Sequence, residues 1–176
     1  MFFIKKILLV VLIFILVGTY IKTETKEQII IPDTSLRFRV ISNSNSIEDY
    51  KIKMEVKKEV EEKLNKLLEN AQNIEETKEI IEGNLQKIDE EVLSILAPKN
   101  IDYKIDFGSN YFPEKIFKGV IYQEGKYDSL VVTIGSGQGE NWWCVLFPPL
   151  CLLEENETTS DVEYQFYVSR IINYFK

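Results

Sequence analysis

The apolar residues of the chain change their spacing several times, and the first regular pattern has the period of a strand. Leu36, Phe38 and Val40 alternate with Arg37 and Arg39, so one face of this strand is apolar and the other is basic. We expect the arginine face to be a solvated or ion-paired sheet surface, as charged faces usually are. A site for an anion or a partner protein is the alternative.

The next segment has the period of an amphipathic helix, which we predict over residues 47–69. Ser46 and Asp49 have the spacing of a helix cap, and the carboxylate suits the positive end of the helix dipole. Apolar residues at spacings of three and four form the stripe Ile52, Val56, Val60, Leu64, Leu67 and Leu68. We expect the charged residues between them to fill the solvent-facing surface: Lys53, Lys57, Lys58, Glu61, Glu62 and Lys63.

A second helix is predicted after a short polar connection. Asn73 and Glu76 form a capping box at its start, Gly83 weakens it slightly, and Pro98 ends it. Its stripe consists of Ile81, Leu85, Ile88, Val92 and Ile95 or Leu96. The short connection makes the two helices antiparallel neighbours. We expect both stripes to cover a sheet, with a partner-binding coiled coil as the alternative.

Beyond the second helix, apolar residues recur at every second position, which indicates strands. The pattern predicts strands over residues 101–107, 120–122 and 130–134, the last two joined by a turn at Gly125. The Gly-Ser-Asn run at 108–110 is expected to end the first of these strands. The aromatic stretch that follows this run is expected to be irregular.

The C-terminal part also alternates and completes the predicted fold. Val162, Tyr164, Phe166 and Val168 are separated by single residues, so we predict a last strand there, followed by a short helix from Ser169. The fold class is therefore α+β, in one domain. It consists of an N-terminal strand, an antiparallel helix pair and a mostly antiparallel sheet.

Residues 135–151 contain both tryptophans, both cysteines and three closely spaced glycines. Gly135, Gly137 and Gly139 predict a bend or bulge that brings the backbone close to another element. Their spacing fits neither G-x-G-x-x-G opening a helix nor a P-loop, so nucleotide binding is disfavoured. The apolar residues at 142–147 predict a strand, which a Pro-Pro turn stops.

In that strand, neighbouring side chains point to opposite faces. Trp142, Cys144 and Leu146 share one face, and Trp143, Val145 and Phe147 share the other. One face meets the helix pair. The other is either covered by the Pro148-Pro149 turn and the aromatic stretch at 111–117 or left open to a partner. Tryptophan is common at interface hot spots, which favours a partner contact. The alternative is that both indoles are buried in the core. The candidate partner-binding residues are Asn141, Trp142, Trp143 and Phe147.

The N-terminus has the pattern of an export signal. Lys5 and Lys6 precede eleven uninterrupted apolar residues at 7–17, which is shorter than the ~20 that span a bilayer. We divide the chain into a signal peptide or N-terminal membrane anchor (1–22), a tether (23–33) and a single domain (34–176). Removal of residues 1–21 changes the net charge from −7 to −9, because it takes away Lys5 and Lys6. Nucleic acid and anionic lipid are therefore disfavoured as partners.

Two cysteines in an exported chain favour a disulfide. Cys144 and Cys151 enclose six residues, a loop that can bring the Cα atoms within the roughly 4.4–6.8 Å that a disulfide requires. Two buried free thiols are the alternative. A cysteine nucleophile is disfavoured because the chain has no histidine to act as its base.

The absence of histidine also removes the usual imidazole ligands of zinc. Acidic pairs such as Asp102 and Asp106 fall on the polar side of a predicted strand, where we expect a solvated face rather than a glycosidase pair. The sequence therefore predicts no catalytic residue, no metal and no cofactor.

Several motifs, in this order and combination, resemble the stage II sporulation protein R family. They are Leu36-Arg37-Phe38-Arg39-Val40-Ile41, Ser42-Asn43-Ser44-Asn45-Ser46, Phe107-Gly108, Phe112-Pro113, Ile134-Gly135-x-Gly137-x-Gly139 and Asn141-Trp142-Trp143-Cys144-Val145-Leu146-Phe147-Pro148-Pro149-Leu150-Cys151. The resemblance extends from Leu36 to about Leu152. One departure is Ile47, where the family tends to carry proline.

The resemblance implies a non-enzymatic signalling protein of endospore-forming bacteria. Such proteins are made in the forespore and exported into the space between the forespore and mother-cell membranes. There they trigger a membrane-embedded aspartic protease, which removes the pro-sequence of sigma factor E. A peptidoglycan-binding module or hydrolase of the envelope is the alternative, since exposed aromatic side chains also suit sugar stacking.

Overall fold

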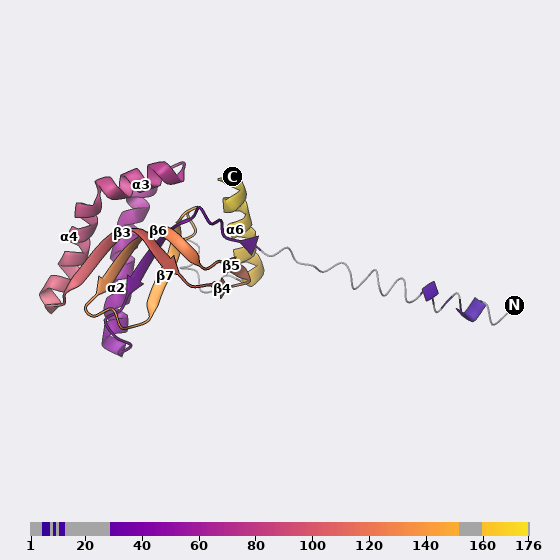
Figure 1. The fold of residues 1–176 in the computed structure, drawn as a ribbon, viewed down its shortest axis with the longest axis horizontal. Helices are drawn as coiled ribbons and strands as arrows, with labels where there is room; N and C mark the ends of the chain where they lie inside the picture. Colours follow the sequence, from indigo (N-terminus) through magenta and orange to yellow (C-terminus); the bar gives the residue numbers. More distant parts are fainter. Residues whose placement is uncertain (1–4, 8, 10, 13–28, 152–159, 176) are drawn as a thin grey trace.

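The computed structural model describes residues 5–7, 9, 11–12, 29–151 and 160–175, which combine helices with two sheets and confirm the α+β class (Figure 1). The larger sheet has four strands in the spatial order β3 (Tyr103–Phe112), β6 (Gly125–Ile134), β2 (Leu36–Ile41) and β7 (Asn141–Phe147). β2 is parallel to β6 and antiparallel to β7, and β3 is antiparallel to β6.

A smaller sheet of three strands lies at one end of the molecule. Its order is β1 (Ile29–Ile30), β5 (Val120–Tyr122) and β4 (Lys115–Phe117). β1 pairs in parallel with β5, and the next residue, Ile31, is fully buried. Residues 29–31, which the sequence analysis placed in a tether, therefore belong to the fold.

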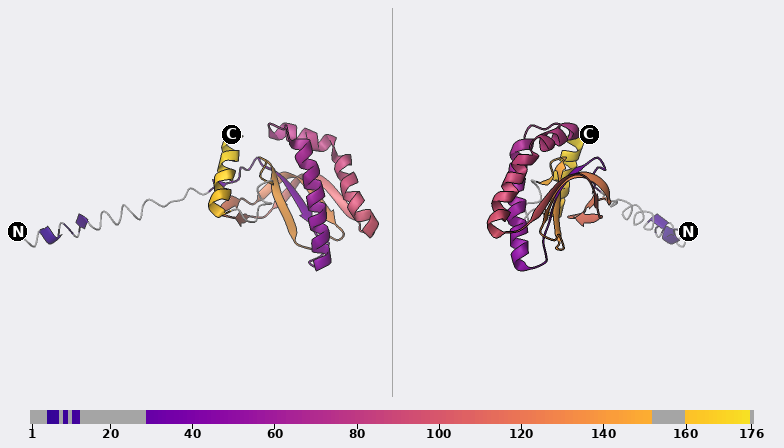
Figure 2. Two further views of the ribbon diagram at one scale, coloured as in Figure 1. Left: turned by 180° about the vertical axis from the view of Figure 1, so that it is seen from behind. Right: turned by 60° about the vertical axis from the view of Figure 1, so that its left-hand side comes forward.

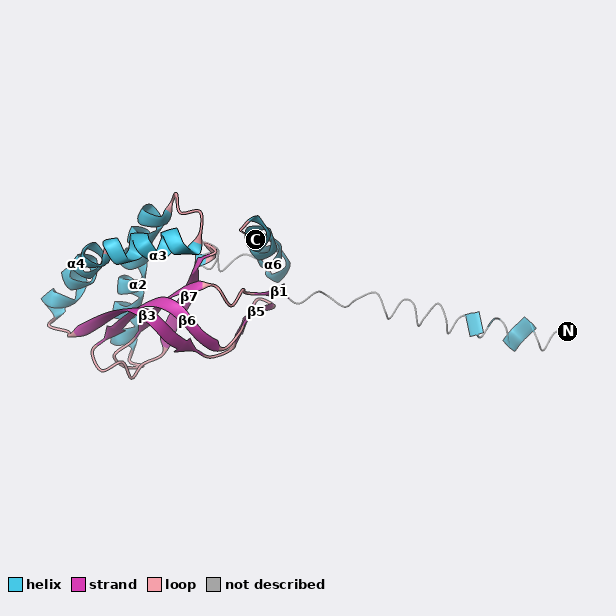
Figure 3. Ribbon diagram, turned by 45° about the horizontal axis from the view of Figure 1, so that its top comes forward, coloured by secondary structure: helices cyan, strands magenta, loops and turns pink. Residues whose placement is uncertain are grey.

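Three helices lie on one face of the four-stranded sheet (Figures 2 and 3). They are α2 (Ile47–Leu68), α3 (Ile74–Gly83) and α4 (Leu85–Leu96), followed by the 3₁₀ turn η1 (Ala97–Lys99). The predicted caps are present, because Ser46 Oγ accepts from Asp49 N at 3.0 Å and Asn73 Oδ1 accepts from Glu76 N at 2.8 Å.

The second predicted helix is in fact divided at Asn84. Its side-chain amide donates to the Ile80 carbonyl at 2.7 Å, and its own ψ of 11° leaves the helical range. Gly83, which favours an irregular backbone, precedes the break. The chain then turns into α4, and Figure 1 shows α3 crossing the end of the layer before α4 returns along α2.

The helices and the sheet bury one apolar cluster between them. Both predicted stripes contribute to it, together with the inward residues of the central strands. Its buried members are Leu36, Phe38, Val40, Ile52, Val56, Val60, Leu64, Ile81, Ile88, Val92, Ile95, Leu96, Leu130, Val132, Ile134, Cys144, Leu146 and Cys151. The stripes cover a sheet, as expected from their period.

A second cluster occupies the opposite face, and α6 (Asp161–Tyr174) contributes to it. Its buried members are Ile31, Phe112, Val120, Tyr122, Tyr127, Trp143, Val145, Leu150, Tyr164, Val168 and Ile172. The prediction of a last strand at 162–168 is therefore wrong. Only every fourth residue of this segment is buried, and Ser160 Oγ caps the helix by accepting from Glu163 N at 3.3 Å.

The strands of the sheet are longer than predicted at two places. β3 continues through residues 108–110 to Phe112, because it pairs with β6 along its whole length, Gly108 opposite Ser129. β6 correspondingly begins at Gly125, where a turn was predicted. Part of the aromatic stretch expected to be irregular is also regular, since it contains the end of β3 and all of β4.

The arginine face of β2 also differs from expectation, since Arg37 is fully buried. Its guanidinium carbon lies 3.4 Å from the ring centroid of Tyr127 and 5.0 Å from those of Phe112 and Trp143. Its Nη2 donates to the Gln123 carbonyl at 3.3 Å. Burial lowers its pKa to about 10. Aromatic rings have replaced water around this cation, so the prediction of a solvated or ion-paired surface is wrong for Arg37.

Most of the predicted export signal and anchor, residues 1–22, lies outside the described residues. The described positions 5–7, 9, 11 and 12 are helical and exposed. Within the part of the chain that the structure describes, no helix combines the length and the apolar character needed to cross a membrane.

Candidate functional site

The glycine segment before β7 packs against the loop that follows β2. Gly139 N donates to the Ser42 carbonyl at 2.8 Å, and Gln138 N donates to the Asn43 carbonyl at 3.1 Å. A Cβ atom at Gly139 would collide with the Ser44 carbonyl oxygen, so the close approach requires glycine. Two segments that are far apart in the sequence are thereby joined through their backbones.

Asp49 organises the loop on the other side of this contact. Its carboxylate accepts hydrogen bonds from Ser44 Oγ and, at 3.1 Å, from Asn43 Nδ2. These bonds, that of Ser44 above all, lower the pKa of Asp49 below its ordinary value. Asn43 Oδ1 in turn accepts from Ser136 N at 3.0 Å. The polar turn predicted after β2 thus fixes the start of β7 as well as the start of α2.

The other end of β7 is held by a disulfide between Cys144 and Cys151, which confirms the predicted pairing. Their Cα atoms are 5.2 Å apart, and Leu150 N donates to the Val145 carbonyl at 3.1 Å within the same loop. Glu61 places a carboxylate oxygen near both sulfur atoms. Since the disulfide occupies both sulfurs, this group does not offer a set of metal ligands.

β7 sends its two tryptophans to opposite faces of the sheet, as its geometry predicted. Trp142 packs on the helix side, with its ring centroid 5.6 Å from that of Phe38. Trp143 is only 6% exposed and lies in the second cluster, 5.4 Å from Phe112 and 5.3 Å from Tyr122 between ring centroids. Of the two, Trp142 is the partly exposed one and lines a surface cavity, and a partner role for either ring remains a prediction.

Phe147 was expected to share the face of Trp143, but it does not. The pairing of β2 with β7 shifts between Leu36, opposite Phe147, and Arg37, opposite Val145. One extra residue in β7 therefore rotates the end of the strand, and the half-buried Phe147 packs with the helix-side cluster. Asn141, the fourth candidate partner residue, is exposed at the start of β7.

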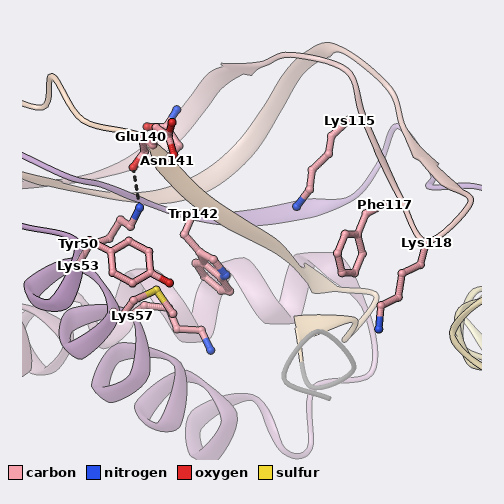
Figure 4. A pocket seen from close by; sticks show the side chains of 10 residues that line it. Tyr50, Lys53, Lys57, Lys115, Phe117, Lys118, Glu140, Asn141 and Trp142 are labelled. Atoms are coloured by element: carbon pink, nitrogen blue, oxygen red, sulfur yellow. Dashed lines mark hydrogen bonds between the residues drawn. The ribbon is translucent and has the colours of Figure 1, made fainter. Parts of the chain in front are cut away.

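Asn141 and Trp142 line a surface groove of about 820 Å³, shown in Figure 4. One wall is the N-terminal half of α2, and the other consists of β4 and the residue after it. The lining residues are Tyr50, Lys53, Met54, Lys57, Lys115, Phe117, Lys118, Glu140, Asn141 and Trp142. We refer to this site as the lysine groove.

Each lysine of the lysine groove lies near an aromatic ring. The Lys57 ammonium is 4.9 Å from the Trp142 ring centroid, and that of Lys53 is 5.0 Å from Tyr50. On the opposite wall, the Lys115 ammonium lies 5.0 Å and the Lys118 ammonium 5.6 Å from the Phe117 ring centroid (Figure 4). The rings hold the cations in place while leaving the wall partly apolar.

Lys53, Lys57 and Glu61 of α2 were expected on the solvent-facing surface, and this prediction is wrong for all three. Lys53 is 5% and Lys57 is 7% exposed. Lys53 Nζ donates to the Glu140 carbonyl at 3.0 Å; burial lowers its pKa, while the charge of Glu140 opposes the shift. Lys57 Nζ lies 2.6 Å from Glu61, itself 2% exposed. The helical spacing of Lys53 and Lys57 to Val56, Val60 and Leu64 was the local signal for this, and their cover comes from β7, which is remote in sequence.

The lysine groove offers groups that can bind a ligand. Its lining residues supply ammonium groups, aromatic rings, a thioether and one carboxylate. This combination can hold a ligand that is both negatively charged and apolar. The sequence analysis named Asn141 and Trp142 for this role but missed the lysines of both walls.

Comparison with known proteins now gives the family. A family model described as stage II sporulation protein R matches residues 32–157, which include β2, the three helices and β7. Stage II sporulation protein R of Bacillus subtilis (strain 168) is 30% identical to this chain over 161 residues, which cover 85% of this chain and 72% of that protein. No solved structure matches the chain. The chain therefore belongs to the stage II sporulation protein R family of sporulation proteins.

Proposed function

We propose that this chain is an exported, non-enzymatic signalling protein of sporulation. In this proposal it acts in the space between the forespore and mother-cell membranes. It contacts the extracytoplasmic part of a membrane-embedded aspartic protease, which then removes the pro-sequence of sigma factor E. Membership in the sporulation family and the basic-then-apolar N-terminal sequence support this proposal.

The observation that carries the proposal is the position of Trp142 in a rigid surface groove. The groove side of β7 is fixed at one end by the backbone contact of Gly139 with Ser42 and at the other by the Cys144–Cys151 disulfide. A rigid aromatic surface loses little conformational entropy when it binds, which favours protein recognition. The segment that carries the family motif therefore also offers a surface for contact.

The test is a reconstituted cleavage reaction that contains the protease in membranes, the precursor of sigma factor E, and this chain. We expect cleavage only when the chain is added, and we expect Trp142→Ala to lower its rate at least ~10-fold while the melting transition is retained. Lys66→Glu, an exposed change on α2 outside the lysine groove, is the control and leaves the rate within about twofold. Equal cleavage with and without the chain would refute the proposal.

A second candidate is binding to peptidoglycan, because Trp142 and the exposed Tyr50 in the lysine groove offer rings on which sugars can stack. Sedimentation with purified cell wall separates the two candidates. Retention on the wall that Trp142→Ala abolishes, without any effect of that variant on precursor cleavage, would favour the envelope role over protease activation.

A further inference from the structure

We propose that the lysine groove binds an extended acidic segment of a partner protein, in which carboxylate side chains alternate with apolar ones. The identity of the partner as the protease rests on the proposed function. The chemistry of the ligand rests on the groove alone. Charge, aromatic rings and the position of two strand edges support the proposal.

The charge of the lysine groove is opposite to that of the chain. The chain has a net charge of −7, yet four lysines and a single acidic residue, Glu140, line this groove, and positive charge is still in excess after the pairing of Lys57 with Glu61. Clustered positive charge in an acidic protein steers a negatively charged partner to one location. The ligand is therefore anionic where it meets the lysines.

The wall formed by β4 gives the anion a defined place. Lys115 and Lys118 both point their ammonium groups at the Phe117 ring, and Lys115 also lies 4.8 Å from the Trp143 ring centroid. Lys115 forms no ion pair with any residue in the described part of the chain. A carboxylate beside Phe117 therefore interacts favourably with Lys115.

The strands that line the lysine groove favour an extended peptide. β4 is an edge strand of the smaller sheet, and β7 is an edge strand of the larger one. Edge strands present unpaired backbone groups with which an extended segment can form hydrogen bonds. Met54, Phe117 and Trp142 then offer apolar contacts for alternate side chains of that segment.

The same features disfavour a polyanion such as nucleic acid or an anionic membrane. Such ligands bind through many phosphates and depend on an extended basic surface. Here the lysines are interrupted by rings, Glu140 lies among them, and the rest of the chain is acidic. A short segment with one or two carboxylates meets the lysines without meeting that wider negative surface.

The experiment titrates the full chain, held in uncharged detergent micelles, with a capped peptide of alternating glutamate and leucine. Tryptophan fluorescence and calorimetry report binding, and the same peptide with glutamine in place of glutamate is the ligand control. We expect the glutamine peptide to bind at least ~10-fold more weakly than the glutamate peptide. We also expect added salt to lower the affinity of the glutamate peptide. Equal binding of the two peptides would overturn the proposal.

Variants locate the binding. Lys115→Glu is expected to lower the affinity for the glutamate peptide at least ~10-fold, and the milder Lys115→Gln is expected to lower it about threefold. Lys66→Glu is expected to change this affinity less than twofold. Lys66→Glu alters the net charge as Lys115→Glu does but lies outside the lysine groove. If Lys115→Glu does not fold, Lys115→Gln still decides. Unchanged affinity in the folded lysine variants would overturn the proposal.

Other occupants give different results. Lysine-dependent binding to phosphatidylglycerol vesicles without binding to the peptide would assign the lysine groove to lipid, and lysine-dependent dimerisation would assign it to a second copy. Either outcome overturns the proposal. If the peptide binds through Lys115 but precursor cleavage is unaffected by Lys115→Glu, the ligand chemistry stands and the proposed function fails at this site.

Discussion

At the residue scale, Asp49 makes the stability of this fold dependent on pH. Hydrogen bonds from Ser44 and Asn43 hold its pKa below the ordinary value of 3.8. A carboxyl whose pKa is lower in the folded state stabilises the fold above its unfolded pKa and loses that contribution as pH falls through the folded value. We therefore predict that Asp49→Asn lowers stability at pH 7, with a difference that shrinks below about pH 4.

Urea unfolding of the wild type and Asp49→Asn at a series of pH values measures this difference. Asp102→Asn is a suitable control, because Asp102 is exposed at the surface before β3. A constant difference between Asp49→Asn and the wild type from pH 7 down to pH 3 would contradict the predicted role of the carboxylate.

Residue-scale predictions from the sequence were accurate where the determinant was local. Both helix caps occur as predicted, because a cap depends on residues three positions apart. The environments of Arg37 and Lys57 were predicted wrongly, since the side chains that cover them come from strands more than sixty residues away. Alternation identifies which residues share a face, but not whether another element covers that face.

At the element scale, α6 shows how one apolar pattern can fit two structures. Val162, Tyr164, Phe166 and Val168 alternate as in a strand, but Tyr164 and Val168 also have helical spacing and continue to Ile172. The Ser160 cap with Glu163 three residues later was the local signal that favoured a helix. Tertiary contacts then select the helix, with Tyr164 hydroxyl 2.5 Å from that of Tyr122 in the second cluster.

Substitutions along this segment distinguish the two structures. In the helix, Val168 is buried and Phe166 is 57% exposed, whereas in a strand both would lie on the buried face. We predict that Val168→Ala lowers the free energy of unfolding by about 1–3 kcal/mol and that Phe166→Ala changes it by less than about 0.5 kcal/mol. Equal losses for both variants in chemical unfolding would show that the helical assignment is wrong.

The elements of the candidate site were predicted better than its surroundings. The glycine bend, the β7 strand and the disulfide follow from residues within 135–151, and all three are present. The lysine groove itself was not predicted, because it exists only where α2, β4 and β7 meet. The helical period does separate Lys53, which lies three residues before Val56 and seven before Val60, from the exposed Lys58 on the opposite face.

At the scale of the whole molecule, the two apolar clusters share one sheet, and its strands β6 and β7 contribute to both. Leu130 of β6 and Cys144 of β7 face the helices, while Tyr127 of β6 and Trp143 of β7 face α6 and the smaller sheet. Because a strand cannot leave one cluster without leaving the other, we predict that both clusters unfold in one cooperative transition.

The two tryptophans allow this prediction to be tested, since each reports on a different cluster. Trp142→Phe leaves Trp143 as the fluorescent probe of the second cluster, and Trp143→Phe leaves Trp142 as the probe of the helix side. In each variant we expect the urea midpoint from fluorescence to coincide with that from far-ultraviolet circular dichroism. Trp143→Phe should have the lower midpoint, because Trp143 is only 6% exposed whereas Trp142 borders the lysine groove. Separate midpoints within one variant would show that the α6 side opens independently of the helix layer.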